Sequence, residues 1–465
     1  MTAHRILIVG AGPAGTRAAE TLVAHGLRPV VVDEGQESGG QIYRREPPAF
    51  SRKGRDLYGF EALKAARMHR VFDALKERID YRPATLVWNL SRGDAWLAGP
   101  RGPERLSYDA ILLASGAMDR VIPFAGWTLP GVYTLGGAQV ALKYQACLVG
   151  KRTLFMGTGP LLYLVAYQYA RHGGEVRGVL DTARLGQGIA ALPKLASGGR
   201  TLLKGLYYHA RLHSRGVPMR SGILPLAAEG GAALEGFRYR DAKGRERRIA
   251  CDALAFGFGL RSETQLADLL GCDFRFDPLN RQWLPEIDAD GRASVERVYL
   301  AGDGAGATGA DAAELRGELA ALALVKDHGG EVDERHMARL RRGLSRLTRF
   351  REGLEAAFPF PRHLAGGISD ETILCRCEAV RAGELRAAAR ELGADEINRV
   401  KAFTRLGMGR CQGRVCGAAA VEVLAHCLGR EVSTLGRLRG QAPVKPLSIA
   451  QATAPEEAGG SEKAA

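Results

Sequence analysis

Short apolar runs separated by glycine-rich turns dominate the first half of the chain. Ile6–Val9 is followed by such a turn, by a helical stretch from Thr16 to His25 and by a second apolar run, Pro29–Val32. Uninterrupted apolar runs of this length are typical of central strands in a parallel sheet, because both faces of such strands are buried. The succession of strand, turn, helix and strand therefore predicts an α/β unit at the N-terminus.

The same succession returns later in the chain. Tyr108–Leu113 predicts another buried strand, and Arg152–Met156 opens a second unit whose next strand is Glu175–Leu180. Strand-like sequence resumes at Cys251–Gly259 and at Val298–Leu300. The order of these runs predicts two Rossmann-like units, with the chain returning to the first unit after it has completed the second.

A basic helix and a linker follow. Residues 335–351 carry seven arginines and no acid, and the apolar residues recur at helical spacing from Leu340 to Leu354. This pattern fits an amphipathic helix packed on a domain, with a docking helix for a partner as the alternative. A proline- and glycine-rich linker at 358–367 then leads to a cysteine-containing segment.

Composition narrows the class of protein. With 465 residues, 46% of them hydrophobic, the chain is long enough for several domains with sizeable cores. The net charge of +14 comes from scattered arginines, which favours a solvated surface over a nucleic-acid, lipid or acidic-protein partner. Eight cysteines are too few for a disulfide framework. Four stand alone and fit small buried residues, namely Cys147, Cys251, Cys272 and Cys427.

The chain shows no targeting or membrane signal. The first strand begins almost at Met1, and no stretch reaches the about 20 apolar residues of a spanning helix. We expect a cytoplasmic protein, and peripheral attachment to the inner face of the membrane stays open.

Gly10-Ala-Gly12-Pro13-Ala14-Gly15 is a dinucleotide-binding fingerprint. The first glycine permits the tight turn, the second lets a pyrophosphate approach the backbone, and the third lets the helix pack close to the strand. Asp33 ends the second strand, where a carboxylate would accept a hydrogen bond from the adenosine ribose, and Glu34 could take that role instead.

Three further loops favour FAD over NAD as the bound dinucleotide. Gly302-Asp303 after a late strand resembles the loop that lies near the flavin in two-dinucleotide flavoproteins. Gly39-Gly40-Gln41 and Ala114-Ser115-Gly116 also resemble flavin-contacting loops of that class. Disulfide reduction is excluded, because no cysteine lies directly after Gly39-Gly40 and none is paired in the middle of the chain.

The second unit has a weaker fingerprint. Gly157 and Gly159 are present, but Leu162 replaces the third glycine, and Asp181 would repel the 2′-phosphate of NADPH. Three interpretations stay open: an NADH site, an adenine nucleotide held without redox chemistry, or a purely structural domain.

Cys375-Arg-Cys377 and Cys411-Gln-Gly-Arg-Val-Cys416 form two close pairs of potential metal ligands. Four thiolates suit a [2Fe–2S] cluster or a tetrahedral zinc ion. The spacing resembles the bacterioferritin-associated-ferredoxin type of [2Fe–2S] module and is unusual for zinc. We therefore predict a two-dinucleotide-binding-domain flavoprotein of Rossmann-like, disulfide-reductase-like architecture with a small C-terminal iron–sulfur domain. The expected segments are 1–117 and 251–330 for FAD, 118–250 for the second nucleotide, 331–370 for helix and linker, 371–440 for [2Fe–2S], and a disordered tail at 441–465.

Together these motifs resemble the FAD-containing α subunits of heteromeric amino-acid dehydrogenases, a family with members in opine oxidase, hydroxyproline dehydrogenase and hydrogen cyanide synthase. The resemblance covers about residues 4–440 and includes Gly39–Tyr43, Gly302–Gly306 and Gly407–Cys416. It implies that a flavoprotein β subunit oxidises the amine, and a small γ subunit is a further implied partner. This chain would pass electrons through FAD and [2Fe–2S] to a quinone or another acceptor. No catalytic base is visible in the sequence.

Two other functions stay open at this point. One is a self-sufficient NADH-dependent oxidoreductase, and the other is a non-catalytic assembly subunit with zinc at the four cysteines.

Overall fold

A computed structural model describes residues 5–452 and places the N-terminal unit in a five-stranded parallel sheet. The strand order is β20 (Val298–Leu300), β7 (Ala110–Leu113), β1 (Ile6–Val9), β2 (Val30–Val32) and β3 (Asp80–Arg82). Helices α1 (Pro13–Ala24), α9 (Ala310–Asp327) and α3 (Ala62–Leu75) pack beside it, with the short α2 (Gly54–Tyr58) before α3. An antiparallel sheet of β4 (Leu86–Ser91), β5 (Asp94–Gly99) and β6 (Gly102–Ser107) extends this domain.

The second unit is another five-stranded parallel sheet. Its order is β12 (Met219–Ser221), β11 (Glu175–Asp181), β10 (Arg152–Thr158), β16 (Ala253–Phe258) and β9 (Val132–Thr134). Around it lie α4 (Leu135–Lys143), α5 (Pro160–Arg171), α6 (Leu185–Leu195), α7 (Arg200–Ser214) and the antiparallel strands β13 (Leu224–Glu229), β14 (Gly236–Arg240) and β15 (Glu246–Ala250).

The chain returns to the first domain later than predicted. β16 pairs in parallel with β10, from Thr153 opposite Ala253 to Thr158 opposite Phe258. The boundary predicted at residue 250 therefore lies one strand too early. The crossing is made by β8 (Ala117–Asp119) and β17 (Leu260–Ser262), which pair with each other, and is followed by α8 (Gln265–Leu269), β18 (Phe274–Asp277) and β19 (Gln282–Pro285).

The cysteine-containing domain is packed against the second unit. It consists of β21 (Ile373–Cys375), β22 (Val380–Arg381), α11 (Ala382–Glu391), α12 (Ile397–Thr404) and α13 (Gly417–Leu428). Leu374, Val400 and Leu424 share one hydrophobic core with Phe256 and Trp127, whose indole Nε1 donates to the Ile373 carbonyl at 2.7 Å. The two domains are therefore joined by buried apolar contacts and not only by a linker.

An ion pair also joins the cysteine-containing domain to the turn between β18 and β19. Arg281 lies in the β18–β19 turn, and its Nε and Nη2 are 3.0 and 2.9 Å from the two carboxylate oxygens of Glu422 on α13. Glu422 is 5% exposed. Glu422→Ala should lower the free energy of unfolding by about 3 kcal/mol, because removal of one partner leaves a buried charge uncompensated. Urea titration followed by circular dichroism measures this change. The exposed Glu431→Ala is the control, and a loss below about 1 kcal/mol would contradict the prediction.

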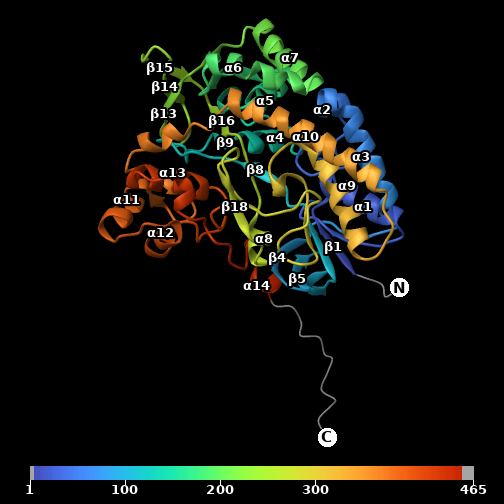
Figure 1. The fold of residues 1–465 in the computed structure, drawn as a ribbon. Coiled ribbons are helices and arrows are strands. Elements are labelled where there is room, and N and C mark those ends of the chain that lie inside the picture. Colours follow the sequence, from blue (N-terminus) through green and yellow to red (C-terminus); the bar gives the residue numbers. More distant parts are fainter. Residues whose placement is uncertain (1–4, 453–465) are drawn as a thin grey trace.

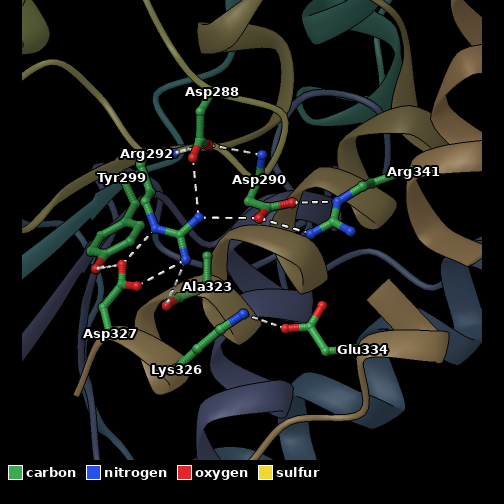
Figure 2. Close-up of polar contacts among 9 residues, drawn as sticks. All are labelled: Asp288, Asp290, Arg292, Tyr299, Ala323, Lys326, Asp327, Glu334 and Arg341. Atoms are coloured by element: carbon green, nitrogen blue, oxygen red, sulfur yellow. Dashed lines mark hydrogen bonds and ion pairs between the residues drawn. The ribbon is translucent and has the colours of Figure 1, made fainter. Parts of the chain in front are cut away.

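Helix α10 (Glu334–Ala357) is a strap that crosses both nucleotide-binding domains (Figure 1). Its first half is fixed to the N-terminal domain, where Arg341 makes contacts of 2.7 and 2.9 Å with Asp290, which also pairs with Arg292 (Figure 2). Its second half places Phe350 in a cluster with Ala191 and Leu195 of α6. The amphipathic helix thus packs on the chain itself, as the first of the two interpretations predicted.

The C-terminal segment is partly ordered. Val444 is buried, and its amide donates to the Trp88 carbonyl of β4 at 3.0 Å, before the short helix α14 (Ile449–Ala452). The prediction of a disordered tail from residue 441 is therefore wrong up to residue 452, because this apolar side chain docks on the antiparallel sheet. Residues 453–465 lie outside the described residues. None of the helices within 5–452 combines the length and apolar character that a membrane crossing needs.

Candidate cofactor sites

The first fingerprint forms the turn between β1 and α1. A Cβ atom on Gly15 would lie 1.8 Å from the carbonyl oxygen of Gly10, so only glycine lets the helix pack this close to the strand. A Cβ atom on Gly12 would meet only the Cα of Gly40, at 3.6 Å. The backbone is thus crowded on the helix side and accessible beside Gly12, as a pyrophosphate requires.

The other predicted loops converge on this turn. A Cβ on Gly10 would lie 2.4 Å from the Ala114 carbonyl oxygen, and one on Gly302 would lie 2.8 Å from the Cβ of Ala14. Pro13 is the first residue of α1. Segments 10–15, 39–40, 114–116 and 302–303 therefore lie together, although they are far apart in the sequence. This convergence fits FAD.

The two acidic candidates have different surroundings. Asp33 accepts the amide of Ala11 at 2.5 Å and that of Gly35 at 2.6 Å, and its burial raises the pKa of its carboxyl group while these two hydrogen bonds act to lower it. Glu34 is exposed and pairs with Lys445. Asp33 is thus held inside the fingerprint turn, whereas Glu34 points to the C-terminal segment. This geometry favours Asp33 as the ribose ligand.

Polar contacts also position the remaining flavin loops. Asp303 accepts the amides of Thr308 and Gly309 at 2.9 and 3.0 Å, so its carboxylate shapes the loop that begins α9. Gln41 is exposed and accepts a hydrogen bond from Arg44. Lys143, which the sequence analysis missed, is buried and donates to the Ile42 carbonyl at 3.0 Å. Burial lowers the pKa of Lys143 to about 8, and only the three-dimensional structure shows this amine beside the Gly40–Gln41 loop.

The second fingerprint is closed by the strap. A Cβ on Gly157 would lie 1.8 Å from the Gly257 carbonyl oxygen, and Gly159 precedes α5. Leu162 is fully buried in the core of this domain. The space beside Gly159 is a cavity of about 40 Å³. Its lining includes Arg351 and Glu355 from the strap, Phe358 and Phe360 from the linker, and Arg120.

Asp181 at the end of β11 is also engaged within the chain. Its carboxylate accepts the Tyr163 hydroxyl and the Ala183 amide, both at 2.8 Å, and burial raises its pKa to about 6. A groove of about 330 Å³ continues from Thr182–Arg184 to the linker residues 359–363. This groove begins at the residue after Asp181 and shares Phe360 of the linker with the cavity beside Gly159.

The four clustered cysteines lie together at the start of α13. Cys416 contacts Cys375 and Cys411, and Cys411 contacts Cys377. The contact with Cys416 lowers the pKa of Cys375 to about 6, helped by backbone amides that include that of Gly407. The contact with Cys416 likewise lowers the pKa of Cys411, with the Val415 and Gly413 amides adding to the effect.

Two observations test how these residues fit an iron–sulfur cluster. A Cβ on Gly409 would lie 2.4 Å from the Cβ of Cys377. The loop can therefore approach the thiols this closely only because residue 409 has no side chain. The donor set is four thiols with amide hydrogen-bond donors, which suits a [2Fe–2S] cluster. Within residues 5–452, no three His, Cys, Asp or Glu side chains surround a single-ion position. Of the four lone cysteines predicted to be buried, Cys251 and Cys272 are buried, Cys427 is half-buried and Cys147 is exposed.

One residue joins the two candidate cofactor sites. The Glu263 amide donates to the Gly116 carbonyl at 3.0 Å, and the Glu263 carbonyl accepts the Ser115 hydroxyl at 2.7 Å. Its carboxylate lies 2.5 Å from Nε of Arg414, between Cys411 and Cys416. The flavin loops and the cysteine loop are therefore separated by a single residue, which no sequence motif marks.

Comparisons with known proteins agree with this architecture. Residues 4–324 match the model of the pyridine nucleotide-disulphide oxidoreductase family, and residues 373–426 match the BFD-like [2Fe-2S] binding domain. The chain is 35% identical to the A subunit of opine oxidase from Rhizobium meliloti over 96% of this chain and 87% of that protein. It is 31% identical to the HcnB subunit of hydrogen cyanide synthase from Pseudomonas protegens over 95% of this chain and 96% of that protein.

A solved structure has the same fold. L-proline dehydrogenase from P. horikoshii superimposes with a TM-score of 0.73 at 18% sequence identity, over 97% of this chain and 79% of that chain.

Proposed function

The chain belongs to the pyridine nucleotide-disulphide oxidoreductase family and carries FAD and BFD-like [2Fe–2S] sites, and from this membership we propose that it is the electron-transfer subunit of a heteromeric amino-acid or opine dehydrogenase. The relatives named as subunits of opine oxidase and hydrogen cyanide synthase support the proposal. A separate β subunit would oxidise the amine, and a quinone or another acceptor would receive the electrons. A small γ subunit is a further proposed partner.

The contact through Glu263 is the observation that carries the proposal. When bound, FAD accepts electron pairs and a [2Fe–2S] cluster passes single electrons. Gly12, Asp33 and Asp303 would hold the dinucleotide, and Cys375, Cys377, Cys411 and Cys416 would hold the cluster. Glu263 contacts Ser115 and Gly116 on one side and Arg414 on the other. This short connection between the two loops supports a relay of electrons from one site to the other.

Co-purification tests the proposal. The affinity-tagged chain, isolated from its native host under anaerobic conditions, should bring a second flavin-containing polypeptide with it. That complex, and not the chain alone, should reduce dichlorophenolindophenol when supplied with secondary amines such as octopine or hydroxyproline. Activity of the chain alone, or a purified chain with neither flavin nor iron, would refute the proposal. One zinc and no iron at the four cysteines would favour the assembly subunit instead.

NADH is expected to leave the spectrum of the isolated chain unchanged. Arg351 and Glu355 of the strap and Phe358 of the linker leave only about 40 Å³ beside Gly159, whereas a ligand pocket for a dinucleotide needs several hundred Å³. Anaerobic absorbance spectra before and after addition of NADH measure this, with dithionite as the control that proves the flavin reducible. Bleaching by NADH within seconds would instead make the protein an NADH oxidoreductase.

A further inference from the structure

Arg261 places a positive charge against the loop between Cys411 and Cys416. It lies on β17, the crossing strand that also borders the flavin loop Gly302–Ala305. Its Nη1 donates to the carbonyl of Arg414 at 2.9 Å and lies 3.4 Å from that of Gly413. A Cβ on Gly417, the residue after Cys416, would lie 3.6 Å from the same nitrogen.

The surroundings leave this charge uncompensated. Glu263 is the acid nearest in sequence, but its carboxylate is paired with Arg414 at 2.5 Å, and both side chains are about one-tenth exposed. Glu378, next to Cys377, is paired with Arg405 at 2.9 Å. Arg261 itself has no acidic partner within 4.0 Å among the described ion pairs, and its buried Nε has no hydrogen-bond partner. Burial and the charge of Arg414 act to lower the pKa of Arg261, whereas Glu263, Cys416 and Cys411 act to raise it.

We propose that Arg261 raises the reduction potential of the [2Fe–2S] centre and so directs electrons from the flavin side to the cysteine loop. The inference rests on the proposed electron-transfer function. A fixed positive charge stabilises the more negative, reduced form of a cluster, and its effect is large where the surroundings are desolvated. Arg261 would act on the cluster through its charge, because its contacts are with backbone carbonyls and not with the thiols.

Potentiometry of the full-length FAD- and cluster-loaded chain tests the inference. Arg261→Gln keeps a hydrogen-bond donor but removes the charge. At the wild-type midpoint potential, the ratio of reduced to oxidised cluster should fall at least tenfold in this variant, which is about 59 mV for a one-electron couple. Electron paramagnetic resonance reports the reduced fraction. Arg261→Lys, which keeps the charge, should stay within about threefold of wild type.

Two further variants separate charge from loop position. Gln265→Ala removes a neutral anchor of the same loop, the 2.6 Å hydrogen bond from Nε2 to the Gln412 carbonyl, and should leave the midpoint unchanged. Glu263→Gln removes a negative charge and should shift the midpoint upward, which keeps the inference testable if Arg261→Gln does not assemble its cluster.

An unchanged midpoint in Arg261→Gln with full iron content would overturn the inference, and so would an equal shift in Gln265→Ala. Either result would leave the electron-transfer proposal intact. That proposal fails separately, if the purified wild-type protein contains neither flavin nor iron.

Discussion

Cys411→Ser should abolish the [2Fe–2S] centre and leave FAD bound. Cys411 contacts both Cys416 and Cys377, so its loss removes one of the two thiol contacts that connect the pairs, the other being that of Cys416 with Cys375. A serine hydroxyl at this position is a harder and less acidic ligand than a thiolate, and iron–sulfur clusters are held by thiolates. We expect iron and inorganic sulfide below a tenth of the wild-type content.

FAD should be retained in this variant for a structural reason. The cysteine loop reaches the flavin side through Arg414 and Gln412, whose contacts with Glu263 and Gln265 do not involve the Cys411 side chain. The domain itself should stay folded, because Leu374, Val400 and Leu424 belong to a core shared with the second nucleotide-binding domain.

Metal analysis, visible spectra and flavin released by denaturation measure the outcome. Cys427→Ser is the matched control, because Cys427 lies on α13 in the same domain but is not one of the clustered thiols. It should keep both cofactors. Full iron content in Cys411→Ser would contradict the ligand assignment, and loss of FAD would show that the cluster loop is needed to form the flavin site.

The parts of the fold that the sequence predicts are those encoded by local patterns. Ile6–Val9 and Val30–Val32 are recognisable because a strand buried on both faces must be continuously apolar. The four clustered cysteines are recognisable because few other arrangements need thiols at such spacing. In both cases a few neighbouring residues carry the information.

The features that the sequence does not predict depend on pairing between distant residues. The apolar run Ala253–Phe258 would suit a buried strand in either parallel sheet. Its place beside β10 therefore follows only from tertiary packing. The helical spacing from Leu340 to Leu354 predicts which face of the strap is buried, but not that its end covers Gly159. Arg261 is a single arginine in a basic chain, and only its contact with the cysteine loop distinguishes it.

The arginines that give the chain its positive charge fall into two groups in the structure. Many arginines make ion pairs within the chain, such as Arg292 with Asp288, Asp290 and Asp327 (Figure 2). Others face solvent, including Arg342, Arg346 and Arg349 on the outer side of the strap. The net charge of +14 is therefore consistent with scattered arginines and does not require a continuous basic groove. Charge alone does not support a nucleic-acid partner.

Gly12→Ala should weaken FAD binding at least about 100-fold, or about 2.7 kcal/mol, without unfolding the protein. In the structure the added Cβ would meet only Gly40 Cα at 3.6 Å, an ordinary contact, so the polypeptide can accommodate it. The same Cβ would lie where the fingerprint needs the pyrophosphate to approach the backbone. The expected defect is therefore in binding and not in folding.

Gly15→Ala and Gly205→Ala distinguish this effect from general damage. Gly15→Ala should destabilise the domain even without FAD, because its Cβ would lie 1.8 Å from the Gly10 carbonyl oxygen. Gly205 on α7 has nothing within 4 Å of its Cβ position, so its replacement should leave FAD binding unchanged and should not destabilise the protein, since alanine favours a helix more than glycine does. Fluorescence titration of apoprotein with FAD and thermal unfolding measure the two effects independently. Wild-type FAD affinity in Gly12→Ala would mean that the pyrophosphate does not lie at this turn, and the convergence of segments 10–15, 39–40, 114–116 and 302–303 would then need another ligand to explain it.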